Sequence, residues 1–223
     1  MQQVKSRKIL IYFFLFLILG TIHNISLSKL NLPKIKKIEI NGLNNDEQIK
    51  IFKDLDFLDT RSLFFLDTVR IKKVLSSHSF IESFSIFRKF PSTLRIDIKK
   101  TSILANRYID GLSFFVGSNG KLIKSEKEIN DIPIVFGNFE NNQFLKLKKM
   151  IDESNLSYLE IDSIYYFDSK RWDIKMKNGI LIKLPNEKTL NALKFVVDLL
   201  LEEKFKDIKL IDTRLNNQVI LNE

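Results

Sequence analysis

The chain has 223 residues, of which 44% are hydrophobic and 11% aromatic, enough to fill the core of one or two domains. Its formal net charge of +9 is dispersed along the chain, so the basic excess predicts no groove for nucleic acid. Cysteine is absent, which excludes disulfides and thiolate metal sites.

The chain begins with a basic tail and an apolar run. Lys5, Arg7 and Lys8 precede residues 9–22, ILIYFFLFLILGTI, which carry no charge. Extended to residue 27, the run is about long enough for a hydrocarbon layer of ~30 Å, and the positive-inside rule places the N-terminus in the cytoplasm. The sequence therefore predicts a cytoplasmic tail at 1–8, a transmembrane helix at 9–27 and a linker at 28–34.

A cleaved signal peptide is the alternative interpretation, because it also combines a basic start with an apolar run. The segment TIHNISLSKL after the run offers no small-x-small cleavage site. This favours a retained anchor with everything after about Ser28 outside the cytoplasm.

Residues 35–103 predict a compact α+β module with two helices on one face of a three-stranded sheet. Apolar and polar residues alternate in its strands, and acidic residues or an Asp cap begin its helices. The expected elements are a strand at 35–43, a helix at 45–55, a helix after Asp67, and strands at 81–90 and 93–100.

Residues 104–223 predict a β-rich domain with flanking helices. Its clearest feature is a hairpin with the turn Asn178-Gly179, and Asn186 is expected to cap the last helix. Strands are expected at 112–116, 121–123, 161–167, 172–176, 180–184, 208–214 and 218–221, and helices at 142–153 and 187–203.

The chain shows no pattern typical of an enzyme or of a metal or cofactor site. Its two histidines, His23 and His78, are far apart, and we interpret His78 as an exposed residue at a helix end. No GxSxG, Walker or GxGxxG motif occurs, and GSNG at 117–120 is typical of a turn.

The last predicted strand lies at the end of the chain and is expected at the edge of a sheet. Such an edge carries unpaired backbone donors and acceptors, so it can receive a strand from another protein. A paired or simply solvated edge is the alternative.

Four motifs, in this order and spacing, resemble the FtsQ/DivIB family of bacterial cell-division proteins. They are IKKIEINGL (35–43), RKFPSTLRIDIKK (88–100), RWDIKMKNGILIKLP (171–185) and IDTRLNNQVIL (211–221). The resemblance covers the whole chain and identifies residues 35–103 as a POTRA domain. The chain departs from the family pattern at Lys100, Ile103, Gly117, Thr213 and Leu215, where an acidic residue, Pro, Asp, Leu and an aromatic are usual.

The resemblance implies a scaffold of the inner membrane, with its ectodomain in the periplasm at the division septum. It implies that the protein links early to late divisome components, binds FtsB and FtsL and controls septal peptidoglycan synthesis, without a cofactor and with a homodimer left open. By position, FtsB would add a strand at Gln218, Val219, Ile220 and Leu221, with Arg214, Leu215 and Arg171 nearby.

Two alternatives stay open. The arginines could form structural cross-strand ion pairs instead of contacting a partner. The POTRA module alone would also suit a membrane-anchored component of protein transport or periplasmic chaperoning, although no long alternating strands of an outer-membrane barrel follow it.

Overall fold

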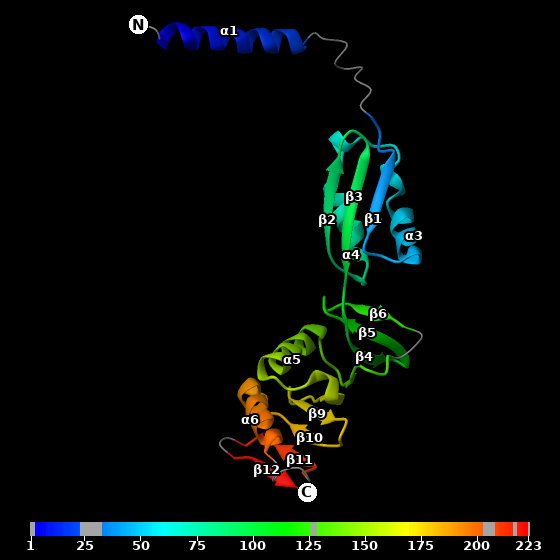
Figure 1. Cartoon of the computed structure of the whole chain (residues 1–223), viewed down its shortest axis with the longest axis vertical. Helices are drawn as coiled ribbons and strands as arrows, with labels where there is room; N and C mark the ends of the chain where they lie inside the picture. The colour runs from blue at the N-terminus through cyan, green and yellow to red at the C-terminus, as the bar shows by residue number, and fades with distance from the viewer. Residues whose placement is uncertain (1–2, 23–32, 126–128, 203–207, 216–217, 223) are drawn as a thin grey trace.

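The computed structural model describes residues 3–22, 33–125, 129–202, 208–215 and 218–222. Two sheets, one of three strands and one of nine, organise the chain after residue 33 (Figure 1). Each sheet has its own hydrophobic core. The predicted mixed α+β class is confirmed, whereas the predicted limits of the tail, linker and domains stay predictions.

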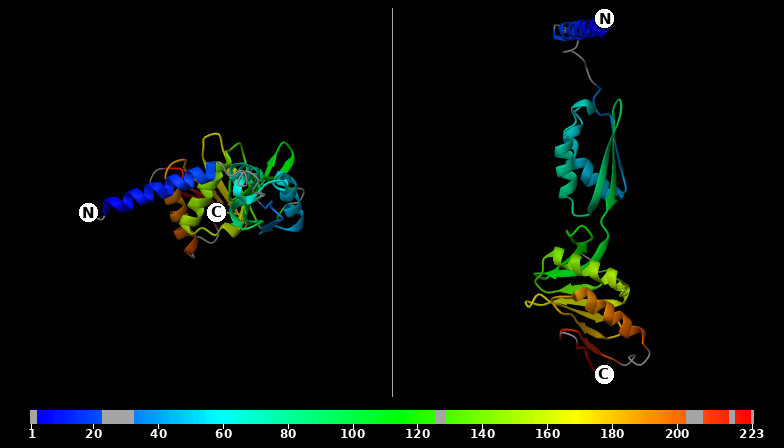
Figure 2. Two further views of the ribbon diagram at one scale, coloured as in Figure 1. Left: turned by 90° about the horizontal axis from the view of Figure 1, so that it is seen from above. Right: turned by 90° about the vertical axis from the view of Figure 1, so that its left-hand side faces the viewer.

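The three-stranded sheet has the order β1-β3-β2, with β1 parallel and β2 antiparallel to the central β3. Its helices cover one face, as Figure 2 shows, so the predicted strand-helix-helix-strand-strand module is confirmed. Its elements are β1 (Lys37–Asn41), α3 (Asn45–Asp54), η1 (Asp56–Leu58), η2 (Leu63–Phe65), α4 (Thr68–Ser77), β2 (Ile81–Lys89) and β3 (Thr93–Lys100).

Local capping explains where the two helices of this module begin. Asn44 and Glu47 form a reciprocal capping box at the start of α3. The side chain of Asp67 accepts a hydrogen bond of 3.0 Å from the backbone N–H of Arg70, as expected for the cap of α4. Alternate residues of β3, Leu94, Ile96 and Ile98, are buried in the core beneath these helices.

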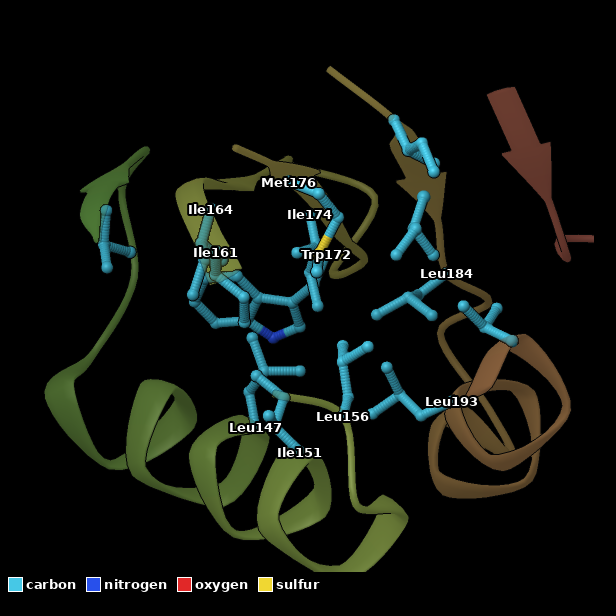
Figure 3. Close-up of a cluster of buried hydrophobic side chains, with 14 of the residues drawn as sticks. Leu147, Ile151, Leu156, Ile161, Ile164, Trp172, Ile174, Met176, Leu184 and Leu193 are labelled. Carbon is cyan, nitrogen blue, oxygen red and sulfur yellow. The ribbon is translucent and has the colours of Figure 1, made fainter. Parts of the chain in front are cut away.

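The nine-stranded sheet has the order β12-β11-β10-β9-β8-β7-β4-β5-β6. Helices α5 and α6 pack on this sheet. Trp172 lies at the centre of the core between the sheet and these helices, among Ile161, Ile164 and Leu147 (Figure 3). Its elements are β4 (Ile103–Ile109), β5 (Leu112–Gly117), β6 (Leu122–Lys124), β7 (Ile134–Phe136), α5 (Asn141–Ser154), η3 (Tyr158–Glu160), β8 (Ile161–Tyr166), β9 (Trp172–Met176), β10 (Leu181–Lys183), α6 (Thr189–Leu201), β11 (Leu210–Asp212) and β12 (Ile220–Asn222).

Three details of this sheet differ from the sequence-based predictions. Strands β4 and β7 were not predicted, and β12 begins two residues later than expected, at Ile220. Helix α6 begins at Thr189 after Lys188, not after Asn186; Lys188 is left-handed at φ 59°, and no side chain caps the helix. Instead, the Thr189 hydroxyl donates to the Pro185 carbonyl oxygen at 2.9 Å.

The N-terminal helix α1 spans Gln3–Ile22, and its large apolar side chains from Ile9 to Leu19 are exposed. Among the helices that the structure describes, none has both the length and the apolar character needed to cross a membrane. The predicted transmembrane helix at 9–27 is therefore not confirmed. Lys5, Arg7 and Lys8 lie within α1. Residues 23–27 lie outside the described residues.

Candidate partner-binding edge

Strand β12 lies at one edge of the nine-stranded sheet. It pairs antiparallel with β11, where Asp212 lies opposite Ile220 and Leu210 opposite Asn222. Within the described ranges, β11 is the only strand that pairs with β12. The edge of β12 that faces away from β11 is therefore open to a further strand.

The side chains predicted to receive a partner strand alternate around this edge. Ile220 is 48% exposed, while Leu221 and Val219 pack partly against the core of the sheet. Gln218 and Val219 precede β12 instead of forming part of it. The edge thus presents one apolar side chain outward and anchors its neighbours inward.

A cavity of about 410 Å³ lies beside this edge. One wall is α6, with Ala192 and Phe195, and the opposite wall comes from the segment between β11 and β12, with Thr213, Leu215 and Val219. Leu215 and Phe195 are 50% and 45% exposed, so the cavity offers apolar surface to a partner.

A second cavity, of about 390 Å³, shares a wall with the first at Pro185, Glu187 and Lys188. Arg171, Arg214 and Lys188 bring three cations to its lining, against the single carboxylate of Glu187. The structure thus brings Arg171 and Arg214, which are distant in the sequence, to one cavity near β12. The guanidinium and ammonium groups in this lining are hydrogen-bond donors that suit carboxylate groups of a partner.

Each arginine also forms an ion pair with a carboxylate two residues away in the sequence. Arg214 Nε donates to Asp212 Oδ1 at 2.8 Å and Arg214 Nη2 donates to Asp212 Oδ2 at 2.5 Å. Arg171 Nε lies 3.6 Å from Asp173 Oδ1. The ion pairs are therefore between residues two apart in sequence, and not across strands as in the alternative considered above.

A row of charged residues links the two arginines, and sequence reasoning missed it. The strand register aligns Asp173 on β9, Lys183 on β10 and Asp212 on β11. Both carboxylates are nearly inaccessible, at 4% and 5% exposure. Because alternate residues of a strand point to opposite faces, the burial of Trp172 and Ile174 puts Asp173 on the other face of the sheet. This alternation is the sequence signal that could have predicted the position of Asp173.

The two carboxylates of this row are shifted in opposite directions. Hydrogen bonds from Arg214 hold the pKa of Asp212 below its usual value. Burial raises the pKa of Asp173, and the nearby Arg171 opposes that shift only in part. Asp212 is thus a stabilised carboxylate, whereas the charge of Asp173 is poorly compensated.

The positions that depart from the family pattern have structural roles of their own. Lys100 Nζ lies 2.6 Å from Glu47 Oε1, Ile103 begins β4, and the buried Thr213 donates its hydroxyl to the Lys183 carbonyl oxygen at 2.8 Å. Gly117 ends β5, and a Cβ at this residue would lie 2.8 Å from both Thr101 Oγ1 and Asn119 Oδ1.

One histidine differs from its predicted environment. His78 was predicted to be exposed, but its side chain is only 15% exposed, with Nε2 3.0 Å from Asp54 Oδ2 and its ring against Phe80. His23 lies outside the described residues. In the described parts of the chain, no three His, Cys, Asp or Glu side chains are grouped to hold a metal ion.

Two family models match this chain. The model of the POTRA domain, FtsQ-type, covers residues 34–100, and the model of the cell division protein FtsQ/DivIB, C-terminal, covers residues 107–214. Together they cover the three-stranded sheet and the nine-stranded sheet as far as β11, and they end before β12.

Curated relatives agree with the family models. Cell division protein FtsQ of Rickettsia bellii is 25% identical over 185 residues, which cover 80% of this chain and 69% of the relative. The FtsQ proteins of Bradyrhizobium diazoefficiens and Cellvibrio japonicus are 22% and 26% identical, over 84% and 68% of this chain. The chain spans only 56% and 49% of those two relatives.

A solved structure, the major extracytoplasmic domain of the trans isomer of the cell division protein DivIB from Geobacillus stearothermophilus, also aligns. It is 16% identical and covers 42% of this chain and 85% of its own length, with a TM-score of 0.34.

Proposed function

The chain belongs to the FtsQ/DivIB family of bacterial cell-division proteins, a family of non-enzymatic scaffolds, and we propose that it receives a strand of FtsB beside β12. The complex would include FtsL and lie in the inner membrane at the septum. There it would link early to late divisome components and control septal peptidoglycan synthesis. The open edge of β12 is the observation that carries this proposal.

An added strand would be recognised by two kinds of contact. Its backbone would extend the ladder beyond β12, and its alternate side chains would meet Ile220 and the cavity between Ala192, Phe195 and Leu215. Main-chain bonds supply affinity there, and the cavity supplies selectivity.

Charge would orient the partner. Acidic side chains of FtsB next to the added strand would lie over the cavity lined by Arg171, Lys188 and Arg214. Because hydrogen bonds to Asp212 hold Arg214, its guanidinium group is pre-positioned for such a contact.

We also propose that the N-terminal segment attaches the protein to the inner membrane, with the N-terminus cytoplasmic and both ectodomain units, 35–103 and 104–223, periplasmic. The exposed apolar side chains of α1 and the cations Lys5, Arg7 and Lys8 support this. Full-length protein should stay with membranes after alkaline extraction, and protease added to spheroplasts should digest residues 35–223. Release by alkali or protection from protease would contradict the proposal.

Proline substitutions in β12 test strand addition. Successive N–H groups of a strand point to opposite edges, so one of Ile220→Pro and Leu221→Pro removes a donor that faces the partner and the other removes one that faces β11. We expect the variant that loses the partner-facing donor to fold with an unchanged circular dichroism spectrum. That variant should fail to retain co-expressed, tagged FtsB from the same genome.

A matched control is available at the opposite edge of the same sheet. Lys124→Pro in β6 changes the edge strand at the other end of the strand order. The Ser125 N–H donates to the Ser113 carbonyl oxygen, so the Lys124 N–H faces away from β5, and Lys124→Pro should leave FtsB retention intact. Retention of FtsB by folded Ile220→Pro and Leu221→Pro variants would refute strand addition at β12.

Charge reversal tests the cationic cavity separately. Lys188→Glu should weaken FtsB binding by about tenfold, roughly 1.4 kcal/mol, and reduce its dependence on salt. The exposed Lys177 lies in the turn after β9, and Lys177→Glu is the control with the same change in net charge. Equal affinities of the two variants would exclude a charge contact at Lys188.

A further inference from the structure

The POTRA module exposes three phenylalanines at one end. Phe64, Phe65 and Phe90 are 51%, 74% and 58% exposed, and the rings of Phe64 and Phe90 lie 5.0 Å apart. Exposed aromatic rings that gather at one place mark an interaction site more often than single exposed apolar residues do. We call residues 33–36, 61–65 and 90–92 the tip of the module.

Backbone hydrogen bonds hold the three segments of the tip together. The Ile35 N–H donates to the Arg61 carbonyl oxygen at 2.9 Å, and the Lys36 N–H donates to the Ser92 carbonyl oxygen at 2.8 Å. Lys34 and Ser62 form an isolated bridge. The rings of Phe64, Phe65 and Phe90 are thus carried by a braced end of the module.

The tip is the end at which the chain enters the module from its N-terminal segment. In Figure 1 it lies at the end of the three-stranded sheet farthest from the nine-stranded sheet. Helix α1, with its exposed apolar side chains, ends at Ile22, and the chain from there to Pro33 can extend at most about 40 Å.

Cations surround the three rings. Lys34, Lys36 and Arg61 are exposed, and no ion pair of theirs is found in the described part of the chain. Two carboxylates, Asp59 and Asp67, also belong to this end, but Asp67 is engaged as the cap of α4. The charge balance at the tip is therefore positive.

We propose that the tip docks on an anionic lipid bilayer, with Phe64, Phe65 and Phe90 inserted at the headgroup boundary and Lys34, Lys36 and Arg61 over lipid phosphates. Apolar rings rimmed by cations are the chemistry that binds such a surface. The tip is the part of the module that follows the apolar α1 segment along the chain, which favours a lipid surface over a second copy or another protein. Docking there would orient the POTRA module on the membrane, independently of strand addition at β12.

Fluorescence of the full-length chain in vesicles tests this contact directly. Phe65→Trp adds a reporter at the tip, and the single natural tryptophan, Trp172, is buried in the other sheet and serves as an internal reference. In phosphatidylcholine vesicles with one quarter phosphatidylglycerol and brominated acyl chains, we expect the emission of the introduced tryptophan to shift to shorter wavelength and to be quenched. Phe195→Trp, at a position on α6 that is 45% exposed, is the control and should be quenched at most about half as strongly.

Two further variants separate lipid contact from tethering by α1. In the Phe65→Trp background, Phe64→Ser with Phe90→Ser should reduce quenching, and Lys34→Glu with Arg61→Glu should abolish its dependence on phosphatidylglycerol, while circular dichroism stays unchanged. The proposal would be overturned if the Phe65→Trp protein bound vesicles but its introduced tryptophan were not quenched. Equal quenching of tryptophan at positions 65 and 195 would also overturn it. A shift that occurs without lipid and grows with protein concentration would assign the tip to a second copy instead.

Discussion

The side-chain amide of Asn119 donates a hydrogen bond of 2.9 Å to the backbone oxygen of Ile81. It donates a second, also of 2.9 Å, to the backbone oxygen of Ser79. Asn119 lies in the turn after β5, whereas Ser79 and Ile81 lie where the chain passes from α4 into β2. One side chain therefore joins the nine-stranded sheet to the POTRA module.

Removing the two hydrogen bonds of Asn119 should lower the stability of the protein. Asn119→Ala removes both bonds and leaves two part-buried carbonyl oxygens without a donor, so we expect the free energy of unfolding to fall by about 1–3 kcal/mol. Urea denaturation monitored by Trp172 fluorescence and by circular dichroism gives the value. Asn191→Ala, at an exposed position of α6, should change it by less than about 0.5 kcal/mol. A similar loss in both variants would contradict a specific role of Asn119.

Gly117 should not tolerate the aspartate that is usual at its position in the family. A Cβ there would lie 2.8 Å from Thr101 Oγ1 and 2.8 Å from Asn119 Oδ1, and the Gly117 N–H is held by the Lys121 carbonyl oxygen at 3.0 Å. We expect Gly117→Asp to cost about 1–3 kcal/mol of unfolding free energy.

A double-mutant cycle identifies the cause. Thr101→Ala removes one of the clashing atoms, so Gly117→Ala combined with Thr101→Ala should cost less than the sum of the two single changes. Strict additivity would show that the clash with Thr101 is not responsible.

Asp212 should make the protein sensitive to acid. Hydrogen bonds from Arg214 hold the pKa of Asp212 in the folded protein below the value in the unfolded chain. Its stabilising contribution is therefore complete above the unfolded pKa and is lost as the pH falls through the folded pKa. Asp212→Asn should lower the unfolding free energy at pH 7 and flatten the decline of that free energy as the pH falls below the unfolded pKa, measured in urea titrations. An unchanged acid slope would refute this.

Asp173 should behave in the opposite way. Burial raises its pKa in the folded protein, so its ionised form opposes folding, and stability falls as the pH rises through the folded pKa. Asp173→Asn should therefore leave stability at pH 7 unchanged or raised, measured in the same titrations. A loss as large as that of Asp212→Asn would show that the 3.6 Å contact with Arg171 compensates the buried charge.

Filling the cavity beside β12 should block the partner without changing the sheet. Ala192 is half-buried on the α6 wall, and Ala192→Phe would occupy part of the 410 Å³. We expect FtsB retention to fall at least about tenfold, with the unfolding free energy lowered by at most about 1 kcal/mol. Leu112→Phe, at an exposed position of β5, is the control, and equal binding by both variants would exclude the cavity from the contact.

Much of the POTRA module could be predicted because its signals are local. Alternation in β3 and the cap at Asp67 act within a few residues, so they fix strand faces and helix starts without knowledge of the rest of the chain. The α6 start was missed because the helix begins after the left-handed Lys188 with no side-chain cap, so the predicted cap at Asn186 is not used. Strand β7 has only three residues, too few for a periodic signal.

The sequence by itself determined the family, the order of the elements in the POTRA module and the residues near the last strand, because motif spacing and hydrophobic periodicity are local properties of the chain. Only the tertiary structure decided that Arg171 and Arg214 line one cavity and that Phe64 meets Phe90. Each of these depends on pairing between residues far apart in sequence. Strand register and packing choose such partners, and no local pattern encodes them.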